Sequence, residues 1–197
     1  TSTISWSAQQ IWVGGVSDTW GTASNWSAGE VPGSTSDVVI PRVNTAQGFR
    51  DPILPSTTTI ASLTIQDGGL FTVQPGSALN INAVTTIQNG GRLAMSGGTW
   101  RVRGDVVNNA GTGGMLMTGG VTIADGTTNQ TFSGANFASL TVSNPTGEVF
   151  MDPTVTTYGD LTIDAGSKVT VQSGDTLRID GSLTVNGRLT LKSGSFL

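Results

Sequence analysis

Residues 161–191, LTIDAGSKVTVQSGDTLRIDGSLTVNGRLTL, decide the fold of this chain. They contain five triplets in which two apolar residues flank a polar one, at 161–163, 169–171, 177–179, 183–185 and 189–191. A period of two places both apolar side chains on one face of a short strand. The residues between the triplets are mainly Gly, Asp, Asn and Ser, which are typical of turns. The stretch therefore predicts a series of short strands with one buried face each, and no helix.

Similar triplets recur from residue 63 onward and align in three columns with a repeat near 22 residues. The first column contains Leu63, Thr85, Val107, Thr131, Val155 and Leu177. The second contains Phe71, Leu93, Leu116, Leu140, Leu161 and Leu183. The third contains Leu79, Arg101, Thr122, Val149, Val169 and Leu189. Repeats of this length are typical of solenoids. We expect each repeat to form one coil of a three-sided helix of strands.

The predicted fold is all-β, a single-stranded parallel β-helix (β-solenoid) with three short strands per coil. About seven coils are expected over residues 38–197, and they are expected to be right-handed, as parallel crossovers almost always are. A β-sandwich is the main rival, because short strands with frequent turns suit it too. The periodicity over six repeats favours the solenoid. The core is expected to contain aliphatic ladders, with Met and aromatic side chains that include Trp100, Phe132 and Phe150.

Composition excludes several classes of function. The 197 residues carry a net charge of −4, with no His and no Cys. An acidic chain without a basic stripe argues against nucleic acid as a partner. The missing His and Cys remove the commonest general base, the thiol nucleophile and the zinc ligands. No apolar run is long enough to span a membrane. We expect no catalytic residues, no enzyme activity and no metal site of the zinc type.

Residues 1–37 differ from the rest, because they hold four of the five Trp: Trp6, Trp12, Trp20 and Trp26. One interpretation is an aromatic cap that closes the open end of the solenoid core. The other is a sugar-stacking platform, with Trp12, Trp20 and Trp26 as candidate ligand-binding residues. The cap is favoured, because an open solenoid end exposes core side chains. Residues 1–37 are thus predicted to be a capping segment and residues 38–197 the β-helix.

The same region carries a resemblance. The run Trp12-Val13-Gly14-Gly15, the centre Asn25-Trp26-Ser27 and the end Asp37-Val38-Val39-Ile40 lie within residues 11–41. This segment resembles the opening module of large secreted bacterial surface proteins, of the adhesin and autotransporter-passenger type, which continue as β-helices. The resemblance implies a secreted or cell-surface protein that is non-enzymatic, an adhesin-like stalk or binding module. Its partner would be a glycan or the surface of a host or neighbouring cell.

The C-terminal end gives a further expectation. The sequence stops at Ser195-Phe196-Leu197, inside what reads as another strand and without a capping segment. Uncapped strands pair readily with other chains. We therefore expect the β-helix to be a fragment of a longer chain, or its C-terminal end to be covered by another copy.

Carboxylates supply two alternatives. Asp160 and Asp164 lie one coil from Asp175 and Asp180, and β-helix enzymes that cleave polyuronides use stacked Asp residues, so a carbohydrate-active enzyme or carbohydrate-binding protein is one alternative. Asp in Gly-rich turns more commonly bonds its own backbone. The Asp-Gly pairs at 67–68, 125–126 and 180–181 could supply oxygen ligands, so calcium stays open while no other cofactor is expected.

Two last features concern the outer surface. Outward Thr residues, among them Thr141, Thr162 and Thr184, allow an ice-binding or self-assembling structural protein as a further alternative. Against this, Thr is simply a good solvent-facing strand residue. The repeat lengthens at residues 108–114 and 144–149. Loops of this kind on a solenoid often carry binding.

Overall fold

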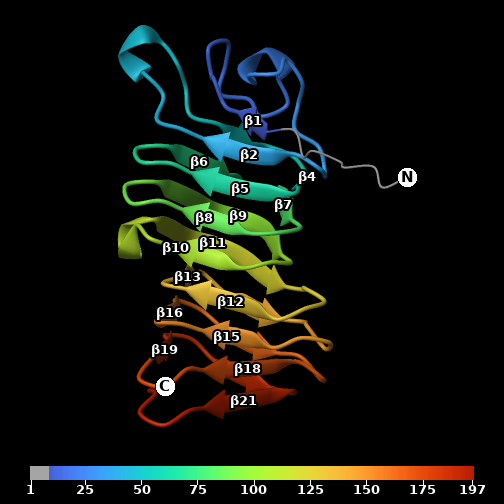
Figure 1. Ribbon diagram of the computed structural model, residues 1–197, viewed down its shortest axis with the longest axis vertical. Helices are drawn as coiled ribbons and strands as arrows, with labels where there is room; N and C mark the ends of the chain where they lie inside the picture. Colours follow the sequence, from blue (N-terminus) through green and yellow to red (C-terminus); the bar gives the residue numbers. More distant parts are fainter. Residues whose placement is uncertain (1–8) are drawn as a thin grey trace, which may run out of the picture.

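The computed structural model describes residues 9–197, so Trp6 and the other residues up to Ala8 lie outside the described part. The chain is a β-solenoid of about seven coils with about 22 residues each, and its strands pair in parallel from coil to coil. Figure 1 shows the coils stacked along the long axis, with the N-terminal segment above them. The fold prediction is confirmed, while the handedness of the coils stays a prediction.

Each coil contributes one strand to each of three faces. Face 1 is a nine-stranded parallel sheet of β1 (Gln9–Ile11), β2 (Asp37–Ile40), β5 (Ser62–Ile65), β8 (Thr85–Ile87), β10 (Val106–Asn108), β12 (Gln130–Ser133), β15 (Val149–Met151), β18 (Lys168–Val171) and β21 (Arg188–Leu191). Face 2 contains β3 (Ile53–Leu54), β6 (Leu70–Val73), the first halves of β9 (Arg92–Val102) and β11 (Met115–Ala124), β13 (Asn136–Phe137), β16 (Thr154–Thr157) and β19 (Thr176–Ile179). Face 3 contains β4 (Thr58–Ile60), β7 (Ala78–Ile81), the second halves of β9 and β11, β14 (Leu140–Val142), β17 (Leu161–Ile163) and β20 (Leu183–Val185).

Three short 3-10 helices interrupt the strands: η1 (Ala23–Asn25), η2 (Thr45–Gln47) and η3 (Gly111–Gly113). The first two lie in the segments above β5 in Figure 1. The predicted boundary at residue 37 coincides with the start of β2. However, β1 lies within the predicted capping segment and already pairs with β2, so this segment belongs to the face 1 sheet as well.

One continuous hydrophobic core runs from Trp12 to Leu177. Alternation within the strands builds it, as in β17, where Leu161 and Ile163 are buried and Thr162 points outward. Phe150 was wrongly predicted to be in the core. It is the outward residue of β15, between the buried Val149 and Met151, because the period of two places neighbours on opposite faces.

The three predicted columns are only half right. Each column stays on one face as far as β11 and β12, and then moves to the next face, so that Leu116 lies on face 2 and Leu140 on face 3. The cause is an uneven pair of coils. From Val106 to Phe132 the chain takes 26 residues (106 to 132), and from Phe132 to Met151 only 19 (132 to 151). The two deviations nearly cancel, so a simple 22-residue count crosses them unnoticed.

Regular pairing was wrongly doubted for residues 38–62 because of three prolines. β2, β3 and β4 all pair in parallel with strands of the next coil. Pro41 follows β2, while Pro52 precedes β3 and Pro55 follows it. The prolines therefore lie at strand ends, where their missing N–H groups are not needed by the ladder.

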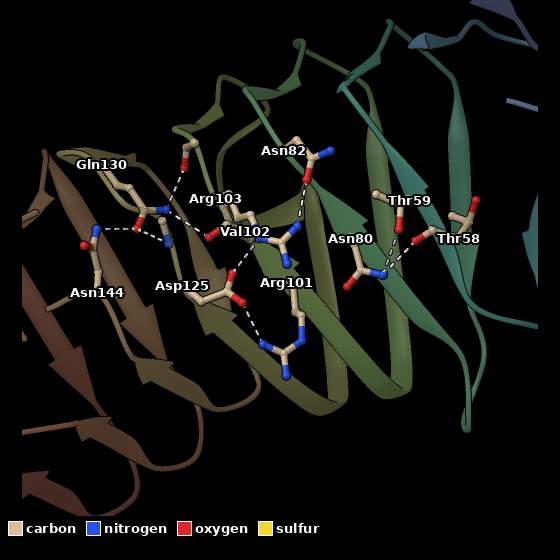
Figure 2. A network of polar contacts seen from close by, with 12 residues as sticks. Thr58, Thr59, Asn80, Asn82, Arg101, Val102, Arg103, Asp125, Gln130 and Asn144 are labelled. Carbon is tan, nitrogen blue, oxygen red and sulfur yellow. Dashed lines mark hydrogen bonds and ion pairs between the residues drawn. The ribbon is translucent and has the colours of Figure 1, made fainter. Parts of the chain in front are cut away.

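Buried amides hold the corners where the chain is longer. The corner between faces 3 and 1 has three residues at 103–105 but six at 143–148. There the Nδ2 of Asn144 donates to the backbone oxygen of Thr128 and to Oε1 of Gln130, at 2.7 and 3.0 Å, and its Oδ1 accepts from the N–H of Gly147. Figure 2 shows this pair beside the charged cluster of Arg101, Arg103 and Asp125.

The other lengthened stretch, residues 108–114, is fixed in the same way. Asn108 donates to the backbone oxygens of Gly111 and Gly134, at 2.7 and 2.8 Å. Both lengthened stretches are thus tied down from inside by an asparagine. Within residues 9–197, no helix has the length and apolarity needed to cross a membrane.

Candidate functional site: a groove beneath the aromatic cap

Three indoles close the N-terminal end of the core. Trp12, Trp20 and Trp26 are only 1%, 2% and 3% exposed. Trp26 lies between the other two, with edge-on contacts at centroid distances of 5.0 Å to Trp12 and 4.6 Å to Trp20. Trp20 stacks on Phe71 of β6 at 4.8 Å, which joins the cluster to the coils. This is the arrangement expected of a cap, and it leaves no face of the three indoles open at the surface.

The cap also positions a long loop, residues 41–52, between β2 and β3. The indole Nε1 of Trp12 donates to the backbone oxygen of Arg50 at 2.6 Å, and the Arg50 N–H donates to the backbone oxygen of Gly14. Gly14 has a φ of +67°, and a Cβ there would lie 2.1 Å from the Arg50 oxygen. Only glycine allows this close approach. The loop, which carries η2, rises above β2 in Figure 1.

A depression of about 490 Å³ lies between this loop and face 2. Its floor consists of Ile53, Leu70 and Thr72, from β3 and β6, and its walls consist of Asp18, Thr45, Gly48, Phe49, Arg50 and Asp51. The floor exists because the outward positions of these two strands carry apolar residues. Asp18 is held in place by its backbone oxygen, which accepts from the Ile53 N–H at 2.7 Å. We call this depression lobe one.

A second depression, lobe two, has a volume of about 440 Å³ and shares Asp51 and Leu70 with lobe one. Its other lining residues are Arg42, Asp67, Gly68, Gly69, Gly90 and Arg92. The glycines make room for it. A Cβ on Gly69 would lie 2.4 Å from the backbone oxygen of Ile40, so no side chain can stand there. The two lobes together form the capped-end groove, and each has a volume typical of small-molecule sites.

Asp51 stands at the junction of the two lobes. Its Oδ1 is covered and has no hydrogen-bond partner among the described residues. Burial raises the pKa of the Asp51 carboxyl, and a hydrogen bond from the backbone of Leu70 partly opposes this rise. An unsatisfied carboxylate costs stability. Groups of this kind concentrate at functional sites, where a ligand or the chemistry repays the cost.

Changing Asp51 to Asn is expected to raise the melting temperature at pH 7 by about 1–3 °C, a small shift because the carboxyl is only partly buried. A raised pKa means that the folded state holds the proton more tightly than the unfolded chain. Stability from this group is therefore lost as pH rises from the ordinary Asp range through the folded pKa. The advantage of Asp51→Asn should disappear below pH 3.8, the ordinary pKa of Asp.

Thermal unfolding followed by circular dichroism between pH 3 and 8 measures this effect. Glu30→Gln is the matched control, because Glu30 is exposed and its replacement should shift the melting temperature by much less. A lower melting temperature for Asp51→Asn at pH 7 would contradict the assigned cause.

The Asp-Gly pairs considered for calcium do not converge on a metal. Asp67 faces Arg42 at 3.7 Å, Asp125 faces Arg101 at 2.6 Å, and Asp180 faces Arg178 at 2.7 Å. Within residues 9–197 no group of three or more metal-ligating side chains is present. Each of these carboxylates is thus already paired with a guanidinium.

The stacked Asp residues bond the turns around them. Asp160 accepts from the N–H of Ser182 at 2.8 Å, and Asp164 accepts from the hydroxyl of Ser143. The Thr row on face 3 aligns Thr141, Thr162 and Thr184. On face 1, by contrast, Thr170 is preceded by the outward Phe150, so that row is interrupted.

The capped-end groove was missed at the sequence level. The signal was the spacing: 12 residues separate β2 from β3 (41–52), whereas four separate β5 from β6 (66–69). The long connection also carries Arg42, Phe49, Arg50 and Asp51, a density of charged residues unusual for this chain. The prolines drew the interpretation toward irregularity, when the extra residues in fact build one wall of the groove.

A family model described as "Domain of unknown function (DUF8693)" matches residues 11–151, which is most of the chain. The chain belongs to the DUF8693 family. The match to DUF8693 includes the aromatic cap, both lobes of the groove and the coils as far as β15. No curated protein and no solved structure matches the chain.

Proposed function

We propose that this DUF8693 protein is a non-enzymatic, adhesin-like binding module of a secreted or cell-surface protein, and that its ligand is a surface glycan held in the capped-end groove. The coils serve as a rigid support. The resemblance of residues 11–41 to the opening module of bacterial surface proteins supports the location.

The groove itself is the observation that carries this proposal. It combines carboxylates, an aromatic side chain and an apolar floor, which is what a sugar needs from a binding site: partners for its hydroxyls and contact for its C–H faces. Its parts are held by the strand ladders of β3 and β6 and by the bonds from Trp12 and Gly14. A groove fixed in this way loses little entropy on binding.

A glycan array tests the proposal with three proteins: the wild type, Thr72→Trp and Thr162→Trp. Thr72 lies on the floor of lobe one, where an indole would fill the space. Thr162 is the matched control, because it is also the outward middle residue of a strand, and it lies on another face five coils away. We expect the wild type and Thr162→Trp to bind the same glycans. Thr72→Trp should bind at least about tenfold more weakly, a loss of about 1.4 kcal/mol.

Two results would contradict the proposal. One is the absence of glycan binding by the wild type, and the other is equal binding by folded Thr72→Trp. New reducing ends after long incubation of a bound glycan would refute the non-enzymatic part.

A further inference from the structure

We infer that the capped-end groove takes a neutral, linear oligosaccharide that lies across both lobes. This inference rests on the proposed function and specifies the class of glycan. It follows from the charges of the groove, from the chemistry of its floor and from the way in which its lobes are joined.

The charges that line the groove cancel. Asp18, Asp51 and Asp67 stand against Arg42, Arg50 and Arg92, so three negative side chains meet three positive ones. Both signs occur in each lobe: lobe one has two carboxylates and a guanidinium, and lobe two has two of each. An acidic glycan would have to place its anionic groups beside carboxylates in either lobe. Burying a charge without a partner is costly, so this arrangement disfavours uronates and sulfated sugars.

A neutral sugar suits the same residues. Each hydroxyl group both donates and accepts, so it can donate to a carboxylate and accept from a guanidinium. Arg92 and Arg42 lie on neighbouring turns, and Arg42 makes only a loose contact of 3.7 Å with Asp67 between exposed side chains. Such exposed pairs are weak, so a ligand can exchange partners with them at little cost.

The floor adds the apolar half of sugar recognition. Ile53 and Leu70 point outward from β3 and β6 instead of the polar residues usual at such positions, and Phe49 stands beside them. The C–H face of a pyranose can pack on this surface. Apolar contact of this kind does not depend on ligand charge, and it gains from the removal of water.

The joined lobes indicate a chain of sugars and not a single one. Lobe one and lobe two meet at Asp51 and Leu70, so a ligand can continue from one into the other without leaving the surface. Occupying both lobes with one molecule makes the second contact intramolecular, which strengthens binding beyond that of either lobe alone.

Isothermal titration calorimetry on the described chain tests this inference. The probes are neutral trisaccharides of glucose, mannose and galactose, the corresponding monosaccharides, and uronate trisaccharides of matched length. We expect a neutral trisaccharide to bind at least about tenfold more tightly than its monosaccharide. Its affinity should change less than about twofold between low and high salt, because no net charge is neutralised.

Variants assign the binding to the lobes. Thr72→Trp should abolish binding to lobe one. Arg92→Ala should reduce trisaccharide affinity about fivefold or more while leaving monosaccharide affinity unchanged. Thr162→Trp and Arg188→Ala are the controls, because Arg188 is exposed and makes only a loose 3.9 Å contact with Glu148.

The outcomes separate the two proposals. Preferential, salt-sensitive binding of a uronate that Thr72→Trp abolishes would overturn the neutral class and retain the groove as a glycan site. Trisaccharide binding no tighter than monosaccharide binding would overturn the two-lobe arrangement. If no sugar binds, or if binding survives Thr72→Trp, the proposed function fails as well.

Discussion

Trp26→Ala is expected to lower the free energy of unfolding of the N-terminal end by about 3–5 kcal/mol, the usual cost of truncating a fully buried aromatic side chain. Trp26 contacts both other indoles of the cap, at 5.0 and 4.6 Å, and its Nε1 donates to the backbone oxygen of Trp20 at 2.8 Å. Removing it therefore leaves a cavity in the cluster and an acceptor without a partner.

Urea unfolding followed by tryptophan fluorescence measures this effect, because Trp12 and Trp20 report directly on the cap. Tyr158→Ala is the control, since Tyr158 is an aromatic side chain that is 44% exposed on a distant coil. Its replacement should cost no more than about 0.5 kcal/mol. Unchanged stability of Trp26→Ala would refute the capping role of the indoles.

The second large effect is expected at Gln130. This side chain is fully buried. Its Nε2 donates to the backbone oxygens of Val102 and Gly104, both at 3.0 Å, and its Oε1 accepts from Asn144 and from the N–H of Gly126. Figure 2 shows that these partners come from successive turns of the chain. Gln130→Ala leaves all four groups unpaired, so we expect a loss of about 3–5 kcal/mol.

Chemical denaturation followed by far-ultraviolet circular dichroism compares Gln130→Ala with Gln88→Ala. Gln88 follows β8 at an exposed position, and its truncation should change stability by less than about 0.5 kcal/mol. Similar losses for both variants would mean that the buried amide is not an organising contact of the wide corner.

The fold was predictable because the alternation of side chains is strict. Triplets such as Leu161-Thr162-Ile163 have only one arrangement that buries their apolar residues, and seven coils repeat it. The assignment of strands to faces was not predictable beyond β12. A long coil followed by a short one changes which face a residue joins without breaking the average repeat. Only the pairing of Thr122 with Leu140 reveals this change.

The groove depends on contacts that no local pattern encodes. Asp18 and Leu70 are separated by about fifty positions (18 to 70), and they line the same space only because the coils stack. Likewise, Arg50 is fixed by an indole from the cap, Trp12. The sequence could indicate that the indoles close the solenoid. It could not indicate that the closed end also supports one wall of a groove.

The cross-coil contacts in the middle of the solenoid have a mechanical consequence. A pull between the two ends would load the coils in series, because each coil contacts chiefly its neighbours. Each boundary would then carry the full tension, and the weakest would part first. Arg101 and Arg103 hold Asp125 across one such boundary, at 2.6 and 3.5 Å, and Gln130 spans the next. Strain would therefore spare the middle of the rod, and a surface protein that is dragged by its ligand would begin to yield nearer its ends.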